Sequence, residues 1–114
     1  MAALPIRAES ARANNFVQFD IAYYEYRHAR AAWNAVIYAP EHLNDDVPDE
    51  IDVPLSRAHT EALKLFLLSP CRQLQHLALK LQVFRDEDVH GGLDCADEIV
   101  DALVRDAAHL VGGR

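Results

Sequence analysis

Residues 15–38, NFVQFDIAYYEYRHARAAWNAVIY, decide the fold of this chain. Phe16, Phe19, Tyr23, Tyr26 and Trp33 recur at steps of three, four and seven, which is the spacing of one face of an α-helix. Seven of the nine aromatic side chains lie in this stretch, so one long helix supplies most of the large apolar surface. We therefore expect the rest of the chain to pack against it.

Three further helices are predicted downstream. Pro40 ends the first helix, because proline disfavours the helical conformation of the preceding residue and donates no backbone hydrogen bond. A second helix is expected from Pro54 or Leu55 to about Leu68. Ser69 as N-cap and Pro70 at the first helical position predict a third helix that runs to about Phe84. Asp94 is expected to cap a fourth helix that ends at Gly112.

These elements predict an all-α fold, with residues 1–114 forming a single four-helix bundle that has one long acidic loop. A regular up-and-down packing and an irregular, orthogonal one are both open. Residues 1–14 are either an extra helical turn that feeds the first helix or a frayed arm. No stretch alternates with period two, so no sheet is predicted. The expected core consists of Phe19, Tyr23, Tyr26, Trp33, Leu74, Leu77, Leu81, Ile99 and Leu103.

Composition restricts the function classes. The net charge of −7 opposes binding of nucleic acid by the protein alone. No run approaches the ~20 apolar residues of a membrane span, so no membrane association is expected. Two cysteines in 114 residues favour a reducing compartment, and we expect a cytoplasmic protein without a cofactor.

The loop after the first helix carries the densest charge. Residues 39–54 contain six acids and neither lysine nor arginine. Mutual repulsion among so many carboxylates favours a basic protein surface as partner. Calcium is the less favoured alternative, because the loop has no glycine and prolines interrupt it. The candidate partner-binding residues are Glu41, Asp45, Asp46, Asp49, Glu50 and Asp52.

Other groups are weaker candidates. Glu25 and His28 form an E-x-x-H pair of the kind that binds metals in helical bundles, but both are expected to face solvent. Arg72, His76 and Lys80 form a basic strip at i, i+4 and i+8 that could follow phosphates, although pairing with Asp97, Asp101 or Asp106 is the favoured use.

Three further residues are singled out. Cys71 and Cys95 are each expected in the first turn of a helix and are interpreted as structural thiols. Arg30 falls inside the aromatic stripe, so it should be paired, stacked on a ring or located at a partner interface.

Three segments also carry a resemblance. Residues 67–84, LLSPCRQLQHLALKLQVF, the tryptophan-bearing first helix and residues 96–110, ADEIVDALVRDAAHL, are similar to small uncharacterised helical proteins of alphaproteobacterial phages and mobile elements. Members of that group carry a segment like T-P-A-P-D-x-x-A-L-x-W-K-L-E before a terminal helix. Ser69-Pro70 and residues 77–81 match it, and a leucine occupies the tryptophan position. The resemblance covers about half the chain and implies an accessory gene that acts on a host or defence protein.

We therefore expect a non-catalytic protein-interaction module. Within that class, the acidic surfaces and the resemblance favour an inhibitor of a host nucleic-acid-handling or defence protein, similar to anti-CRISPR proteins. The alternative is a small metal-binding protein or an enzyme that uses histidines and carboxylates. A homodimer is compatible with the sequence.

Overall fold

The computed structural model describes residues 8–42 and 46–112, with side chains from Gln18 onward except that of residue 90. All the regular elements in these residues are helical, which confirms the all-α, four-helix prediction. The four long helices are α1 (Ala8–Ile37), α2 (Asp49–Leu68), α3 (Leu74–Asp86) and α5 (Ala96–Gly112). A 3-10 turn, η1 (Pro40–His42), follows α1, and a single turn, α4 (Val89–Gly92), precedes α5.

The first helix is continuous from Ala8 to Ile37, so residues 8–14 feed directly into it, which is the first of the two alternatives left open for this segment. The start of α2 lies five residues earlier than the predicted Pro54. Asp49, Glu50 and Asp52 occupy its first turns, where carboxylates interact favourably with the positive end of the helix dipole. Pro54 lies inside this helix near its start, and it donates no backbone hydrogen bond there.

The third helix starts later than predicted, because Ser69 ends α2 and does not begin α3. Its hydroxyl donates a hydrogen bond of 2.6 Å to the carbonyl oxygen of Phe66. Residues 70–73 then run outside any helix, and Gln73 is the N-cap of α3. The expected position of Cys71 in a helical first turn is therefore wrong.

The connection between α3 and α5 contains the short helix α4, which the sequence did not predict. Asp88, with φ of 51°, adopts the left-handed conformation that turns the chain into α4. The last helix begins at Ala96, and the amide of Ile99 donates to the carbonyl of Cys95, so Asp94 is not the cap. The side chain of Asp94 instead lies 3.7 Å from Lys64 Nζ on α2.

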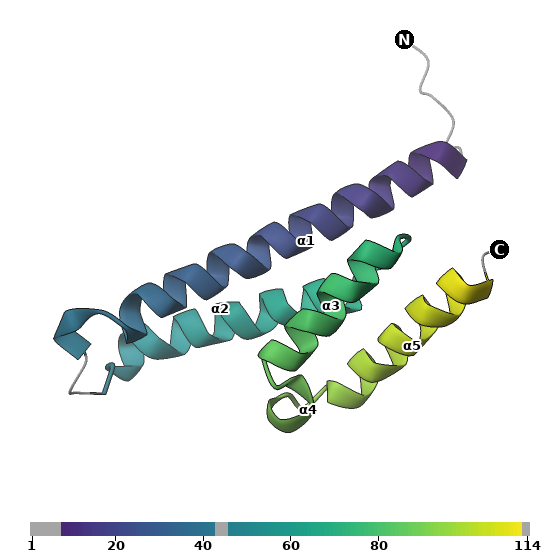
Figure 1. Cartoon of the computed structure of the whole chain (residues 1–114). Helices are drawn as coiled ribbons and strands as arrows, with labels where there is room; N and C mark the ends of the chain where they lie inside the picture. The colour runs from purple at the N-terminus through teal and green to yellow at the C-terminus, as the bar shows by residue number, and fades with distance from the viewer. Residues whose placement is uncertain (1–7, 43–45, 113–114) are drawn as a thin grey trace, which may run out of the picture.

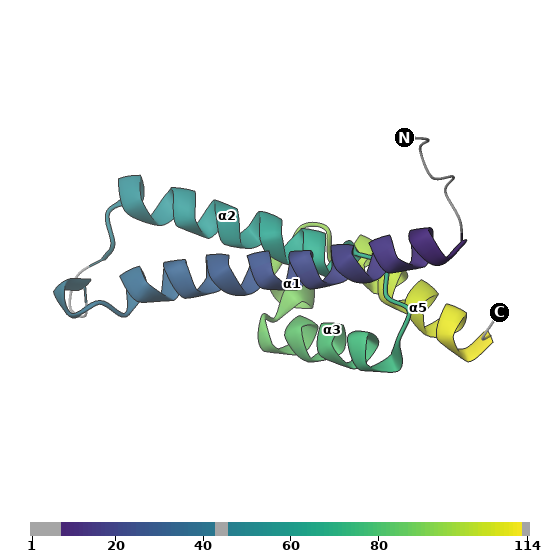
Figure 2. The ribbon, with the colours of Figure 1, turned by 90° about the horizontal axis from the view of Figure 1, so that it is seen from above.

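The helices form two layers (Figure 1). The long helices α1 and α2 run antiparallel as a hairpin, and α3 and α5 run roughly antiparallel to each other in a second layer against it (Figures 1 and 2). The core lies where the layers meet, and its fully buried apolar side chains are Phe66, Leu67, Val89 and Ile99. Phe19, Tyr26, Leu77 and Leu103 are buried as predicted, and Tyr23 and Trp33 are partly buried.

Two predicted core residues are on the surface. Leu74 is 70% exposed and Leu81 is 48% exposed. The reason is that α3 turns a different side inward, with Leu77, Lys80 and Val83 as its buried residues. A helix with apolar residues on more than one side does not reveal from its sequence which side faces the core.

Candidate functional site

The acidic segment lies at the tip of the α1–α2 hairpin. In both views this end of the hairpin extends beyond α3 and α5 (Figures 1 and 2). Glu41, Asp46, Asp49 and Glu50 are all exposed there, whereas Asp45 lies outside the described residues. We call these four residues the acidic tip. The expected loop is thus partly helical, because its second half forms the first turn of α2.

Asp52 has a different environment from the other acids. It is partly buried, and its Oδ1 accepts a hydrogen bond of 2.9 Å from Trp33 Nε1. This bond joins the last turns of α1 to the first turns of α2. Asp52 therefore holds the two helices of the hairpin together next to the acidic tip.

The sequence has no lysine or arginine between Arg30 and Arg57. The segment that forms the acidic tip therefore carries no lysine or arginine of its own to neutralise these carboxylates. The same end of the hairpin also exposes apolar surface, with Tyr38 70% exposed and Ile51 42% exposed. Exposed tyrosine is typical of protein–protein contact surfaces, in which aromatic residues are enriched and the rim is polar.

A buried polar network crosses the interior below the tip, centred on Glu87. Glu87 Oε2 accepts a hydrogen bond of 2.5 Å from the Tyr26 hydroxyl and lies 3.2 Å from His59 Nε2. Arg30 Nε is 3.4 Å from the same oxygen. The side chains of Glu87 and His59 are each only 7% exposed. We call these four residues the Glu87 network.

The partners of Glu87 stabilise its ionised form. Burial acts to raise the pKa of Glu87, but hydrogen bonds from His59 and Tyr26 and the charge of Arg30 outweigh it, so the pKa is lowered. Burial and the bond to Glu87 raise the pKa of Tyr26. A buried carboxylate with this many partners is stable in its ionised form.

Aromatic contacts extend the network towards the tip. Trp33 packs on His59 with ring centroids 5.1 Å apart, and the guanidinium carbon of Arg30 lies 5.6 Å from the Trp33 ring centroid. Arg30 is thus both paired and stacked, two of the three alternatives left open for it. The rest of the network was missed, because Tyr26, His59 and Glu87 come from α1, α2 and the end of α3, far apart in sequence.

The contact between His59 and Glu87 at the centre of the Glu87 network has little access to solvent, whereas the Arg30 side chain is 36% exposed. A hollow of about 340 Å³ lies between α1 and α3, and Tyr26 and Arg30 contribute to its lining. Neither His59 nor Glu87 is among the described residues that line this hollow. The geometry therefore supports a structural role for the contact between the histidine and the carboxylate.

The predicted basic strip does not form an exposed row. Lys80 is completely buried, and its Nζ donates hydrogen bonds to Asp106 Oδ2 at 2.7 Å and to the carbonyl oxygen of Ser69. This is the internal pairing that the sequence favoured. His76 is partly buried, with its ring stacked on Phe19 at a centroid distance of 3.9 Å. Arg72 remains exposed and donates to His109 Nε2 at 2.8 Å.

The two cysteines are free thiols. Cys71 is buried in the connection before α3, and burial together with the nearby charge of Asp106 raises its pKa to about 11. Such a thiol is in its neutral form at physiological pH. Cys95 is partly buried immediately before α5.

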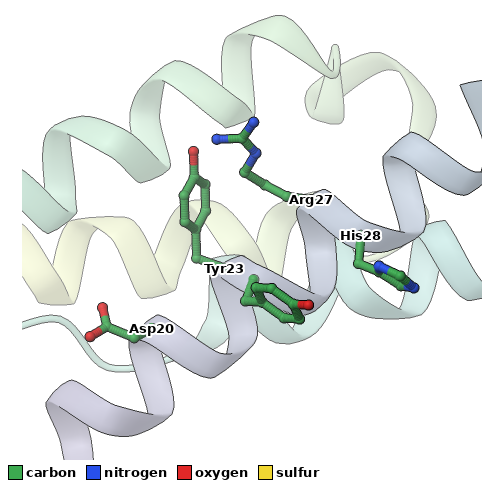
Figure 3. A pocket seen from close by; sticks show the side chains of 5 residues that line it. Asp20, Tyr23, Arg27 and His28 are labelled. Carbon is green, nitrogen blue, oxygen red and sulfur yellow. The ribbon is translucent and has the colours of Figure 1, made fainter.

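Glu25 and His28 are both exposed on α1. His28 lines a shallow hollow of about 520 Å³ together with Asp20, Tyr23, Tyr24 and Arg27 (Figure 3), and its ring stacks on Tyr24 at 6.1 Å. Glu25 does not contribute to the described lining of this hollow. Among the side chains that the structure describes, no three of His, Cys, Asp or Glu type come together in a group that could hold a metal ion.

Comparison with known proteins finds no matching family model, no similar curated protein and no similar solved structure. None of the described helices combines the length and the apolar character that crossing a membrane requires.

Proposed function

We propose that this protein is a non-catalytic protein-interaction module that presents its acidic tip to a basic surface of a partner protein. The observation that carries the proposal is the position of Glu41, Asp46, Asp49 and Glu50. All four are exposed at the end of a helical hairpin that projects beyond the rest of the molecule (Figure 1).

The tip is held in place from within, which favours binding. The Trp33–Asp52 hydrogen bond ties α1 to α2, and the Glu87 network anchors α1 through Tyr26 and Arg30. A surface that is ordered before binding loses less conformational entropy when the complex forms. The carboxylates are therefore presented on a preorganised support.

The charge of the tip indicates the chemistry of the partner. Carboxylates without neighbouring lysine or arginine attract a cluster of such residues, and this attraction increases the association rate more than the final affinity. Proteins that bind nucleic acids carry clusters of this kind in the grooves that accept phosphates. The proposed activity is inhibition of such a host or defence protein by occupation of its basic groove, in the manner of anti-CRISPR proteins and in line with the phage resemblance.

The test compares two variants with equal charge. The tip variant carries Glu41→Gln, Asp46→Asn, Asp49→Asn and Glu50→Gln. The control variant carries Asp20→Asn, Glu25→Gln, Asp97→Asn and Glu98→Gln. Each changes the net charge from −7 to −3, since four charges are removed (−7 + 4 = −3). Each also removes two acids from the first turn of a helix, α2 or α5, so losses of helix-dipole stabilisation are matched.

Parent, tip variant and control variant are used as baits in a host lysate, and captured proteins are identified by mass spectrometry. We expect a basic protein that binds the parent and the control but not the tip variant. Its association rate with the parent should fall as salt is added, over a screening length of about 8–10 Å near physiological ionic strength. A partner that binds the tip variant as fast as the parent would refute the proposal.

A further inference from the structure

An open apolar groove runs between α3 and α5 and has a volume of about 330 Å³. Its lining includes Leu77, Leu81 and Phe84 from α3 and Val100, Val104 and Ala107 from α5. Several of these side chains face solvent, since Val104 is 60% exposed, Leu81 48% and Val100 40%. The described lining contains no charged residue.

Both helices carry this surface in a regular pattern. Leu74, Leu77, Leu81 and Phe84 follow one another at steps of three, four and three on α3. Val100, Val104, Ala107 and Val111 follow at steps of four, three and four on α5. This is the spacing of residues that interdigitate with another helix. The two rows therefore form a seam suited to helical partners.

The shape of the molecule leaves this seam uncovered. The chain has a radius of gyration of 17.3 Å, whereas a compact domain of 114 residues has about 13 Å. Its shortest dimension is only 21 Å. Helices α3 and α5 pack on the α1–α2 hairpin at one side and have apolar residues on the other as well.

Charges of opposite sign border the two sides of the groove. The bond between Lys80 and Asp106 marks the side of α3 that faces α5. Arg85 lies on the opposite side of α3, one turn from Leu81. On α5, Leu103 lines the part of the groove nearer to α3. Asp101 lies on the opposite side of α5, next to Val104. Both Arg85 and Asp101 are exposed, and Arg85 also forms an exposed ion pair of 3.1 Å with the neighbouring Asp86.

These two charges lie at the same height along the groove. Lys80 and Asp106 are in contact, so they mark one level of the roughly antiparallel pair α3 and α5 (Figure 1). Arg85 lies five residues beyond Lys80, and Asp101 lies five residues before Asp106. Because both helices rise by about 1.5 Å per residue, Arg85 and Asp101 end up level with each other.

We infer that a second copy of this chain occupies the groove, related by a two-fold axis parallel to α3 and α5. Each α3 then packs on α5 of the other copy, and the two apolar seams cover each other. Rotation about this axis does not shift a residue along the helix direction, so Arg85 and Asp101 remain level with each other in the dimer. Arg85 of each copy therefore faces Asp101 of the other copy, once on each side of the interface. All neighbouring helices in this arrangement are antiparallel, which also aligns their dipoles favourably.

The test is sedimentation equilibrium of the full chain over a range of concentrations, with folding checked by circular dichroism. The parent should form a species of 25.6 kDa, twice the chain mass of 12.8 kDa. Val104→Glu should weaken the dimer by at least about a hundredfold, because it would bury an unpaired carboxylate. Leu65→Glu is the matched control, since Leu65 is 59% exposed but lies on α2 in another apolar hollow.

The charge pair is tested by a swap. Arg85→Asp and Asp101→Arg should each weaken the dimer by about tenfold, and the double variant should recover most of the parent affinity. A parent that stays monomeric, a dimer that survives Val104→Glu, or an equal effect of Leu65→Glu would overturn the inference. A double variant no tighter than either single variant would also overturn it, since the two-fold arrangement requires the pair.

Discussion

The hydroxyl of Tyr26 donates a hydrogen bond of 2.5 Å to Oε2 of Glu87, a residue 61 positions further along the chain. This bond ties the first helix to the end of α3, directly before the turn that leads into α4. The same oxygen lies near His59 of α2 and Arg30 of α1, so one carboxylate joins three segments of the fold. Its protonation should therefore be visible in the stability of the whole domain.

The free energy of unfolding should depend on pH through Glu87. Folding lowers the pKa of this carboxyl from its ordinary value of 4.5, so its contribution is complete above that value and is lost as pH falls through the lower, folded pKa. At pH 7, Glu87→Gln should cost about 1–3 kcal/mol, because the charged partners lose their counter-charge. Denaturant titrations at pH 7 and below pH 4 should show this difference shrinking.

The exposed Glu25→Gln variant is the control for that experiment. It should stay within about 0.5 kcal/mol of the parent at every pH, as surface substitutions usually do. A difference between parent and Glu87→Gln that stays constant from neutral to acidic pH would contradict the assignment.

The buried ion pair between Lys80 and Asp106 should be costly to break from one side only. Lys80→Ala leaves Asp106, whose side chain is only 13% exposed, without its partner and should cost about 3–5 kcal/mol. The double variant Lys80→Met with Asp106→Leu removes both charges and should return to within about 2 kcal/mol of the parent. Chemical denaturation of Lys80→Met, Asp106→Leu and the double variant completes a mutant cycle, and additive losses would show that the two residues are not coupled.

Cys71 should resist alkylation in the folded protein. Its side chain is buried and its pKa is raised to about 11, so at pH 8 it forms about a hundredfold less thiolate than an ordinary thiol. The measurement compares the iodoacetamide reaction of Cys95→Ala, which retains Cys71, with that of Cys71→Ala. Cys71 should react much more slowly until denaturant is added, and equal rates in the native state would be inconsistent with its burial.

Phe66 should be the most costly aromatic side chain to truncate. It is fully buried and its ring contacts those of Phe19, Tyr23 and Tyr26. Phe66→Ala should lower the free energy of unfolding by about 3–5 kcal/mol. Tyr24→Ala, which removes an aromatic ring that is 69% exposed, should change it by less than about 1 kcal/mol. Similar losses in both would place the core elsewhere.

The class of the fold could be predicted from local pattern. The aromatic residues of α1 recur with helical spacing, Pro40 follows the end of that helix, and Gly112 lies at the end of the last one. These signals act over a few residues, so they do not depend on the rest of the fold. The boundaries at Ser69 and Asp94 were wrong for different reasons. Ser69 bonds back to the carbonyl of Phe66 and so ends α2, whereas Asp94 lies beside Lys64 of α2, a contact that no local pattern reveals.

The acidic tip was also visible in the sequence, since its charges lie close together along the chain. The Glu87 network and the exposed seam on α3 and α5 were not visible. Local pattern suggested that Leu74 and Leu81 face the core, and the tertiary structure instead buried Lys80 and Glu87. The orientation of a helix with several apolar sides, and the burial of a charge beside partners tens of residues away, depend on contacts between distant segments. Only the packed chain brings those segments together.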